Sequence, residues 1–395
     1  MKEKPKVVIT GGYLWSYYEW FLLGLYKLQD AGEIKLKFKL PLLSQLLTWP
    51  NINFGYRVLN HYHRKFDTYT YNMTGYVEFE DGKRKQFTID CSDAPYMFNE
   101  KLLKETDAYF KIQYPCEIDC KGFHLTPSIE IPWIDSEHVD GSGKKTLTSR
   151  GVRKVITDLG QYKQKIHPLM QGPRNLSLGL SKQALKRGYD NYFASRKVSK
   201  DKKIMCYFGN ALGPRPEVVD EPDYLCEGDV VGFFGERISH PNEKRAIVAD
   251  YISHLDNSDA RVISQSYADS HQGINENLVI PLSDFCEHVA NFQYNFNVSG
   301  YCKSIASRFI ESFMVGTAIM TDKLCVKWYL PFDSSEVVET VEMGYLPNKD
   351  VDWKTFSSDL QSLPETNPSK ILENFDNKWA PQVVAEYMID IIRMG

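Results

Sequence analysis

Residues 300–331 constrain the fold of this chain more than any other stretch, and they read GYCKSIASRFIESFMVGTAIMTDKLCVKWYLP. Polar residues recur there at the three-and-four spacing of one helical face, whereas apolar residues occupy the opposite face. The polar face holds Ser304, Ser307, Arg308 and Glu311. The apolar face holds Ile305, Ala306, Phe309, Ile310 and Phe313. The pattern predicts an amphipathic helix with a core stripe on one side and polar chemistry on the other.

A short buried strand is expected after this helix. Gly316 stands where the end of a helix needs a residue that accepts positive φ, and residues 317–321 then read as a strand that ends at Asp322. A helix that feeds a strand is typical of an open α/β sheet, in which ligands lie beyond the carboxyl ends of the strands. Gly300, Lys303 and Ser304 are expected to open the helix there, where unpaired N–H groups favour anions.

Arg308 and Glu311 form the chemically suggestive pair on the polar face. A guanidinium offers a fork of donors that matches a diphosphate, and a carboxylate one turn later suits a ribose diol. This pairing fits a nucleotide sugar. An ordinary Arg–Glu pair on a solvated helix explains the same spacing equally well.

The length and charge of the chain limit the class of protein to which it can belong. A chain of 395 residues exceeds what one core usually fills, so we expect two domains of about 150 to 200 residues each. The 47 Lys and Arg residues nearly balance the 51 Asp and Glu residues, which argues against a general nucleic-acid binder. The eight cysteines are scattered through the chain, which favours a reducing compartment over a disulfide framework or a metal site.

The N-terminus predicts a first β-loop-α unit. Residues 6–10 read as a strand, Gly11 and Gly12 follow, and residues 15–28 form a helix that is apolar nearly all round and therefore buried. No secretory h-region and no apolar run of about 18 residues is visible, so we expect a cytoplasmic protein. The lysines just before the helix leave a peripheral membrane contact open as an alternative.

The candidate general bases follow a predicted hairpin. Residues 68–88 alternate as a hairpin that turns at Asp81-Gly82, and its second strand runs into Asp90 and Asp93. Acids at the carboxyl end of a strand suit general-base chemistry, although helix capping explains Asp93 equally well.

A third candidate base lies further along the chain. Residues 107–113 read as another strand, and His124 follows in a loop at residues 122–127. A lone histidine of this kind is more often structural than catalytic.

The middle of the chain carries the predicted domain boundary. Residues 136–145 read as a flexible loop, and the charge run at residues 197–203 marks the boundary. Beyond it, residues 204–208 and 230–234 read as strands that each end in a glycine loop.

These two loops precede a helix that contains Lys244 and Arg245, so together they predict a phosphate cradle. Neither loop is a Walker A motif or a dinucleotide-binding fingerprint. A strand at 261–265 and helices at 284–291, 370–375 and 379–394 complete the predicted elements.

The order of these motifs resembles the nucleotide-sugar half of exostosin-like glycosyltransferases. The likeness covers residues 204–330 and consists of a strand, FFGE with a basic helix, and then S-x-x-R-x-x-E-x-x-x-x-G followed by a strand. Its matches are Gly300, Ser307, Arg308, Glu311 and Gly316. The chain departs from the family at NFQYNFNVSG, where a cysteine- and proline-rich segment is common.

This resemblance implies an α/β fold of the GT-B type, with two Rossmann-like domains that face each other across a cleft. We therefore expect an acceptor-side domain at residues 1–200 and a nucleotide-sugar domain at 201–378. The helix at 379–395 is expected to return to the first domain. Arg308 is expected at the donor diphosphate and Glu311 at the ribose.

The predicted function is transfer of a sugar from a nucleotide-diphosphate sugar to a glycan, a glycolipid or another hydroxyl acceptor. No cofactor and no metal are expected, because GT-B enzymes typically stabilise the diphosphate with basic side chains and no DxD motif stands at a clear strand end. The base candidates are Asp93, Asp90 and His124, and a retaining enzyme would need none of them. The donor-site candidates are Arg308, Glu311, Ser307, Ser304, Lys303, Gly300, Gly235, Glu236, Arg237, Arg245, Gly209 and Asn210.

Two other functions fit the same pattern. A nucleotide-sugar epimerase or hydrolase would use the donor motif without an acceptor. A non-catalytic sugar- or nucleotide-binding protein would keep the donor site and tolerate the loss of every acid in the first domain.

Overall fold

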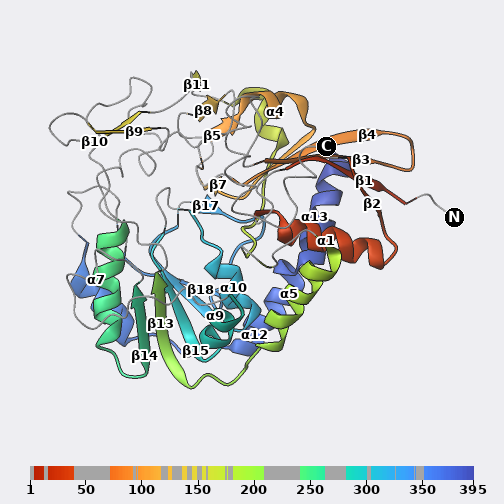
Figure 1. Cartoon of the computed structure of the whole chain (residues 1–395). Coiled ribbons are helices and arrows are strands. Elements are labelled where there is room, and N and C mark those ends of the chain that lie inside the picture. Colours follow the sequence, from red (N-terminus) through yellow and green to blue (C-terminus); the bar gives the residue numbers. More distant parts are fainter. Residues whose placement is uncertain are drawn as a thin grey trace.

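The computed structural model shows an α/β protein with two main sheets that lie in separate regions of the molecule (Figure 1). It describes residues 4–12, 17–39, 72–91, 95, 97–116, 123–126, 136–139, 145–148, 154–156, 159–173, 176, 181–208, 241–262, 282–299, 304–324, 326–341, 343 and 351–395.

The first sheet has six strands in the order β12-β6-β4-β3-β1-β2. The strands are β1 (Lys6–Gly11), β2 (Lys35–Phe38), β3 (Asn72–Glu78), β4 (Arg84–Asp90), β6 (Ala108–Lys111) and β12 (Ile166–Pro168). All neighbouring pairs are parallel except those of β3, which runs antiparallel to both β1 and β4. The predicted hairpin is confirmed, and Gly82 takes a φ of 76° in its turn.

Helix α1 (Glu19–Asp30) is buried, as predicted for the apolar helix, and it begins at Glu19. It packs against α13 (Pro381–Met394), the last helix of the chain, and α13 also contacts β4. The two helices approach closely at Gly24, where an added Cβ would lie 2.0 Å from the carbonyl oxygen of Pro381. Glycine is therefore needed at this crossing. Helix α5 (Lys182–Ala194) lies beside α1.

The second sheet has five parallel strands in the order β14-β13-β15-β16-β18. The strands are β13 (Lys202–Phe208), β14 (Ser258–Val262), β15 (Phe292–Asn297), β16 (Ala318–Thr321) and β18 (Val337–Glu339). Among the described strands, the chain first adds β14 on one side of β13 and then β15 on the other. The order thus reverses between β13 and β15, which is the switch point where doubly wound sheets bind ligands.

Helices cover both faces of this sheet. They are α7 (Pro241–Ser253), α9 (Leu282–Val289), α10 (Arg308–Met314) and α11 (Trp353–Gln361). Successive side chains of a strand point to opposite faces. Asn295 donates a hydrogen bond to Ser312 of α10 at 3.0 Å, whereas the neighbouring Phe296 packs edge-to-face on Phe356 of α11. Helices α10 and α11 therefore lie on opposite faces of β15.

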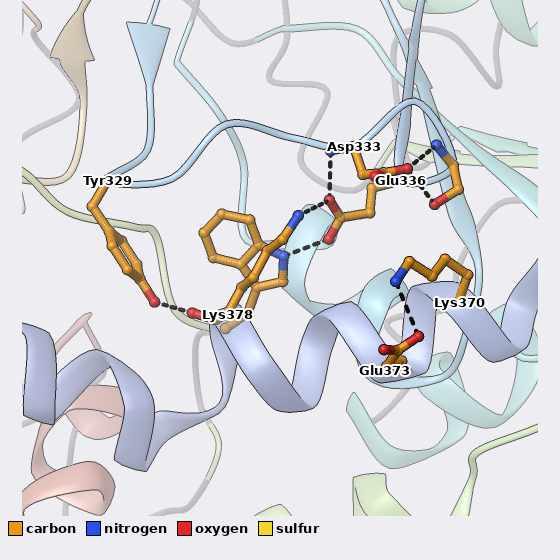
Figure 2. Close-up of polar contacts among 8 residues, drawn as sticks. Tyr329, Asp333, Glu336, Lys370, Glu373 and Lys378 are labelled. Carbon is orange, nitrogen blue, oxygen red and sulfur yellow. Dashed lines mark hydrogen bonds and ion pairs between the residues drawn. The ribbon is translucent and has the colours of Figure 1, made fainter.

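A buried carboxylate joins the second sheet to the start of α13. Glu336 accepts hydrogen bonds from the Trp379 indole (2.6 Å), the Asp333 backbone N–H (2.6 Å) and the Lys378 ammonium (3.2 Å), as Figure 2 shows in part. Trp379 ends the π-helical turn η4 (Phe375–Trp379), and its carbonyl accepts a hydrogen bond from Trp20 of α1. This chain of bonds links both halves of the molecule.

Smaller elements complete the described residues. They are β5 (Met97–Asn99), α4 (Glu100–Glu105), β7 (Tyr114–Pro115), β8 (Phe123–Thr126), β9 (Ser136–Val139), β10 (Lys145–Thr148), β11 (Lys154–Ile156), η2 (Gly160–Lys165), β17 (Val326–Lys327) and α12 (Pro368–Asn374). Strand β7 pairs with β17 between the two sheets (Figure 1).

Two local predictions were wrong, and one strand was missed. Residues 123–126 form β8 rather than a loop, because β11 and β5 pair with it from elsewhere in the chain. Ser136–Val139 forms β9 rather than a loop, because it pairs with β10. The polar segment before Gly300, to which the sequence assigned no element, contains the central strand β15.

The helix expected to open at Gly300, Lys303 and Ser304 begins instead at Arg308. A side chain from the first half of the molecule contacts the segment just before this start. Gln113 bonds both the N–H and the carbonyl of Ile305, and the N–H of Phe309, which would bond this carbonyl in a longer α-helix, donates to Ala306 instead. The helix stop was predicted correctly, since Gly316 has a φ of 79° and β16 follows.

Candidate functional site

Two arginines meet at the switch point of the second sheet. Phe208 is the last residue of β13, and its ring is completely buried. The guanidinium carbon of Arg308, from the start of α10, lies 5.4 Å from the centre of this ring. The guanidinium carbon of Arg245, from the first turns of α7, lies 5.8 Å from the same centre. Both cations are within the range of a cation–π interaction with one phenyl ring.

The two arginines repel each other electrostatically. Burial and the nearby charge of Arg245 lower the pKa of Arg308 to about 10, while Glu311 acts in the opposite direction. At neutral pH Arg308 is therefore still a cation, although burial and the positive charge of Arg245 disfavour its charged form. Its Nη1 atom is buried and has no hydrogen-bond partner among the residues that the structure describes. An acceptor with negative charge would satisfy both this atom and the local charge.

Hydrogen bonds between polar side chains join the carboxyl ends of the neighbouring strands β15 and β16. Asp322 accepts hydrogen bonds from the backbone N–H of Ser299 (2.9 Å) and from its hydroxyl (2.8 Å). Asn297 donates to the hydroxyl of Thr321 at 3.1 Å. These bonds tie the residues at the end of β15 to those at the end of β16. The Oδ1 atom of Asn297 is buried and, within the described part of the chain, has no hydrogen-bond partner.

Only some of the predicted donor-site residues lie in the described part of the chain. The structure brings Arg308 and Arg245 together. Ser307 occupies the position just before α10 without a capping bond from its side chain, and Ser304 is buried outside the helix. The other candidates lie outside the described residues: Gly300, Lys303, Gly209, Asn210, Gly235, Glu236 and Arg237.

Glu311 is buried, with 6% of its surface exposed. Its charge raises the pKa values of Tyr192 on α5 and Cys286 on α9, for both of which burial is the larger cause. Glu311 thus lies close to the helices behind α10, and it supports the charge of Arg308. A role at a ribose remains a prediction.

The base candidates lie in or near the first sheet. Asp93 is outside the described residues, and His124 has its backbone on β8, paired with Val155 and Met97. Asp90 ends β4 and is completely buried, where it forms an ion pair with Lys111 at 2.8 Å and accepts a hydrogen bond from the Tyr109 hydroxyl at 2.8 Å. These contacts give Asp90 a clear structural role.

Sequence reasoning missed four residues of this region. Phe208, Asn297, Asp322 and Gln113 stand at or just after the carboxyl ends of strands. The rule that pointed to Asp90 also applies to Asp322, which directly follows a predicted strand. Phe208 and Gln113 carried no local signal, because their roles depend on residues far along the chain.

The described residues contain neither a cluster suited to a metal ion nor a helix suited to span a membrane. No group of three or more His, Cys, Asp or Glu residues in that part of the chain is arranged to hold a metal ion. None of its helices has the length and apolar character needed to span a membrane.

Comparisons with known proteins give only distant similarities. No family model and no curated protein matches the sequence. Among solved structures, the chain is similar to WaaG, a glycosyltransferase involved in lipopolysaccharide biosynthesis, with 11% identity over 98% of this chain and 100% of that one and a TM-score of 0.38. It is also similar to the GtfA/B complex, with 10% identity over 81% of this chain and 67% of that one and a TM-score of 0.33. Both scores are too low to carry an argument about fold or activity.

The fold class rests on the sheets themselves. The predicted α/β architecture with two Rossmann-like sheets is confirmed and is consistent with a GT-B layout. It has one departure, the antiparallel strand β3 inside the first sheet.

Proposed function

We propose that this chain is a glycosyltransferase that moves a sugar from a nucleotide-diphosphate sugar to a hydroxyl group of a glycan or glycolipid. One observation carries the proposal, namely that Arg245 and Arg308 converge on Phe208 at the switch point. Two cations held together at this edge suit a ligand with at least two negative charges, and a diphosphate has the right charge and size.

The arginines would act on the leaving group. As the bond from the sugar to the diphosphate breaks, negative charge grows on the phosphate oxygens. Fixed guanidinium groups stabilise this charge without having to reorganise, and the buried Nη1 atom of Arg308 gains the acceptor that it lacks among the described residues. In this proposal the nucleotide sugar is a co-substrate and no metal is required.

The acceptor hydroxyl must lose its proton if the enzyme inverts the sugar's configuration. Asp93 remains our proposed base. Asp90 is less suited, because its carboxylate already accepts from Lys111 and Tyr109 in a completely buried position. His124 remains an alternative.

The first test is ligand-induced thermal stabilisation. Pyrophosphate, nucleoside diphosphates and their sugars would be added to the wild-type protein and to the Arg308→Ala and Arg393→Ala variants. Arg393 is a matched control because its ion pair with Asp390 lies on the last turn of α13. A ligand present at 100 times its dissociation constant should stabilise the native state by about 2.7 kcal/mol, which raises the melting temperature by several degrees.

The proposal predicts that one diphosphate stabilises the wild type and the Arg393→Ala variant but not the Arg308→Ala variant. The matching nucleotide sugar would then be incubated with and without hydroxyl acceptors, and transfer would be followed by mass spectrometry. If the folded wild type gained no stability from any of these compounds, the proposed function would be wrong.

A further inference from the structure

Gln113 connects the first half of the molecule to the segment that carries Arg308. It follows β6, and its side chain is completely buried. Its amide nitrogen donates to the carbonyl of Ile305 at 3.0 Å, and its amide oxygen accepts from the N–H of Ile305 at 3.0 Å. These two bonds reproduce the reciprocal pattern of a strand pair, although one partner is a side chain.

This contact lies directly before α10. The carbonyl of Ile305 accepts from Gln113, and the N–H of Phe309, which would bond this carbonyl in a longer α-helix, donates to Ala306 at 3.2 Å instead. The ordinary helical bonds begin with that from Glu311 to Ser307 at 3.1 Å. Arg308 is the first helical residue, and its guanidinium carbon lies 5.4 Å from the centre of the Phe208 ring.

Gln113 is itself held firmly from the first sheet. Two residues before it, Lys111 forms the buried ion pair with Asp90, and the N–H of Ile112 donates to the carbonyl of Asp90 at 3.1 Å. Directly after Gln113, strand β7 pairs with β17, which follows β16 of the second sheet. The segment around Gln113 is therefore bonded to the first sheet before this residue and to β17 after it. A displacement of this segment would also displace Ile305.

We propose that Gln113 is a positioning residue that acts through Ile305 to hold Arg308 over Phe208 and so sets the anion affinity of the site. The inference rests on the proposed function for the identity of the anion. It also couples the two halves, because a molecule that binds the first half and moves Gln113 changes diphosphate affinity, and diphosphate has the reciprocal effect.

The test uses inorganic pyrophosphate as the probe, with dissociation constants from titration calorimetry. Gln113→Ala removes both bonds to Ile305. Gln113→Glu keeps the acceptor for the N–H of Ile305 but places a carboxylate against its carbonyl. Asn99→Ala is the control, since Asn99 is also completely buried and its side chain caps α4 within the first half.

Both Gln113 variants should weaken pyrophosphate binding by about tenfold, as expected when a charged group is displaced by a fraction of an ångström. Asn99→Ala should lose stability and keep its affinity within about twofold, because a lost cap has no path to Arg308. Adding Gln113→Ala to Arg308→Ala should have no further effect on binding, since the positioned group is already gone.

Hydrogen exchange of residues 304–311 provides a second readout that needs no ligand. Exchange at Ile305 and in the first turn of α10 should be faster in Gln113→Ala and unchanged in Asn99→Ala. Wild-type protein that fails to bind pyrophosphate would overturn the proposed function, while the exchange data would still decide the positioning role. Unchanged exchange, or unchanged affinity in a wild type that does bind, would overturn the inference about Gln113.

Discussion

The carboxyl ends of the two sheets hold buried charge in opposite ways. At the first sheet, Lys111 on β6 faces Asp90 on the neighbouring strand β4, and both side chains are completely buried in one ion pair. At the second sheet, Arg308 and Arg245 share the ring of Phe208, and the charge of Arg245 contributes to the lowered pKa of Arg308. The carboxyl edge of the first sheet therefore holds a closed ion pair, whereas that of the second sheet brings two cations to one aromatic ring.

This difference is why we propose the edge of the second sheet, rather than that of the first, as the ligand site. In the first sheet the charges of the buried ion pair satisfy each other, and the Tyr109 hydroxyl adds a hydrogen bond to Asp90. In the second sheet the charge of Arg245 contributes to the lowered pKa of Arg308, and an anion bound beside both guanidinium groups would offset their repulsion. Strained electrostatics of this kind are more typical of functional sites than of structural ones.

The largest effect on stability is expected from breaking the buried ion pair between Lys111 and Asp90. Lys111→Met leaves Asp90 buried without its cation, which should lower the free energy of unfolding by about 3–5 kcal/mol. Adding Asp90→Asn should restore part of this loss, because the uncompensated charge is removed. Urea denaturation of the three proteins measures both effects.

The exposed pair Lys370–Glu373, with a separation of 3.0 Å, provides the control for this experiment. Lys370→Met should change stability very little, because solvent screens the pair. If Lys111→Met were as mild as Lys370→Met, the first edge would not be held by its ion pair and the comparison between the two edges would fail.

The parts that sequence reasoning predicted depend on local signals. The hairpin turn at Gly82, the buried helix α1 and the strand β16 after Gly316 each follow from a periodic pattern and one special backbone position. Arg308 was predicted as a site residue from its spacing on a helical face, and Arg245 from its place near the start of a helix. The structure brings both to the ring of Phe208, while their role at a ligand stays a prediction.

The parts that were missed depend on distant contacts. Gln113 and Ile305 are separated by 192 positions, so no local pattern shows that they bond to each other. Strand β15 was missed because its sequence, FQYNFN, is rich in polar residues. Its asparagines are accommodated by specific partners such as Ser312 and Thr321, and these become visible only when the sheet is assembled.

A smaller effect is expected from removing one of the paired arginines. Arg245→Leu should weaken pyrophosphate binding by about ten- to a hundredfold, since one charge-assisted contact contributes about 1.5–3 kcal/mol. Its free energy of unfolding without ligand should stay within about 1 kcal/mol of the wild type or rise, because repulsion of Arg308 is relieved. Calorimetric titration and urea denaturation give the two values.

This result would sharpen the contrast with Lys111→Met, which should lose stability in the absence of any ligand. A large loss of ligand-free stability in Arg245→Leu would instead mean that Arg245 is structural. The second edge would then be internally compensated, like the first.

The smallest effect concerns Asp259, an acid on β14 that is compensated as Asp90 is, but at a half-buried position. Burial alone would raise its pKa, but the hydrogen bond from His288 at 2.7 Å and the nearby Arg261 at 3.0 Å lower the pKa below its usual value. As the pH falls, the unfolded chain therefore takes up a proton at this position before the folded protein does. The stabilisation is complete above the pKa of the unfolded state, near 3.9, and is lost as the pH falls through the folded pKa.

Urea denaturation between pH 5 and about pH 3 would test this pH dependence. Asp259→Asn should flatten the fall in stability with decreasing pH, and His288→Gln should flatten it partly, because it removes the hydrogen bond that lowers the pKa most. Wild-type slopes in both variants would mean that Asp259 is not compensated in the folded state. Partial flattening would show that opposite charges compensate an acid on the second sheet, as they do for Asp90 on the first.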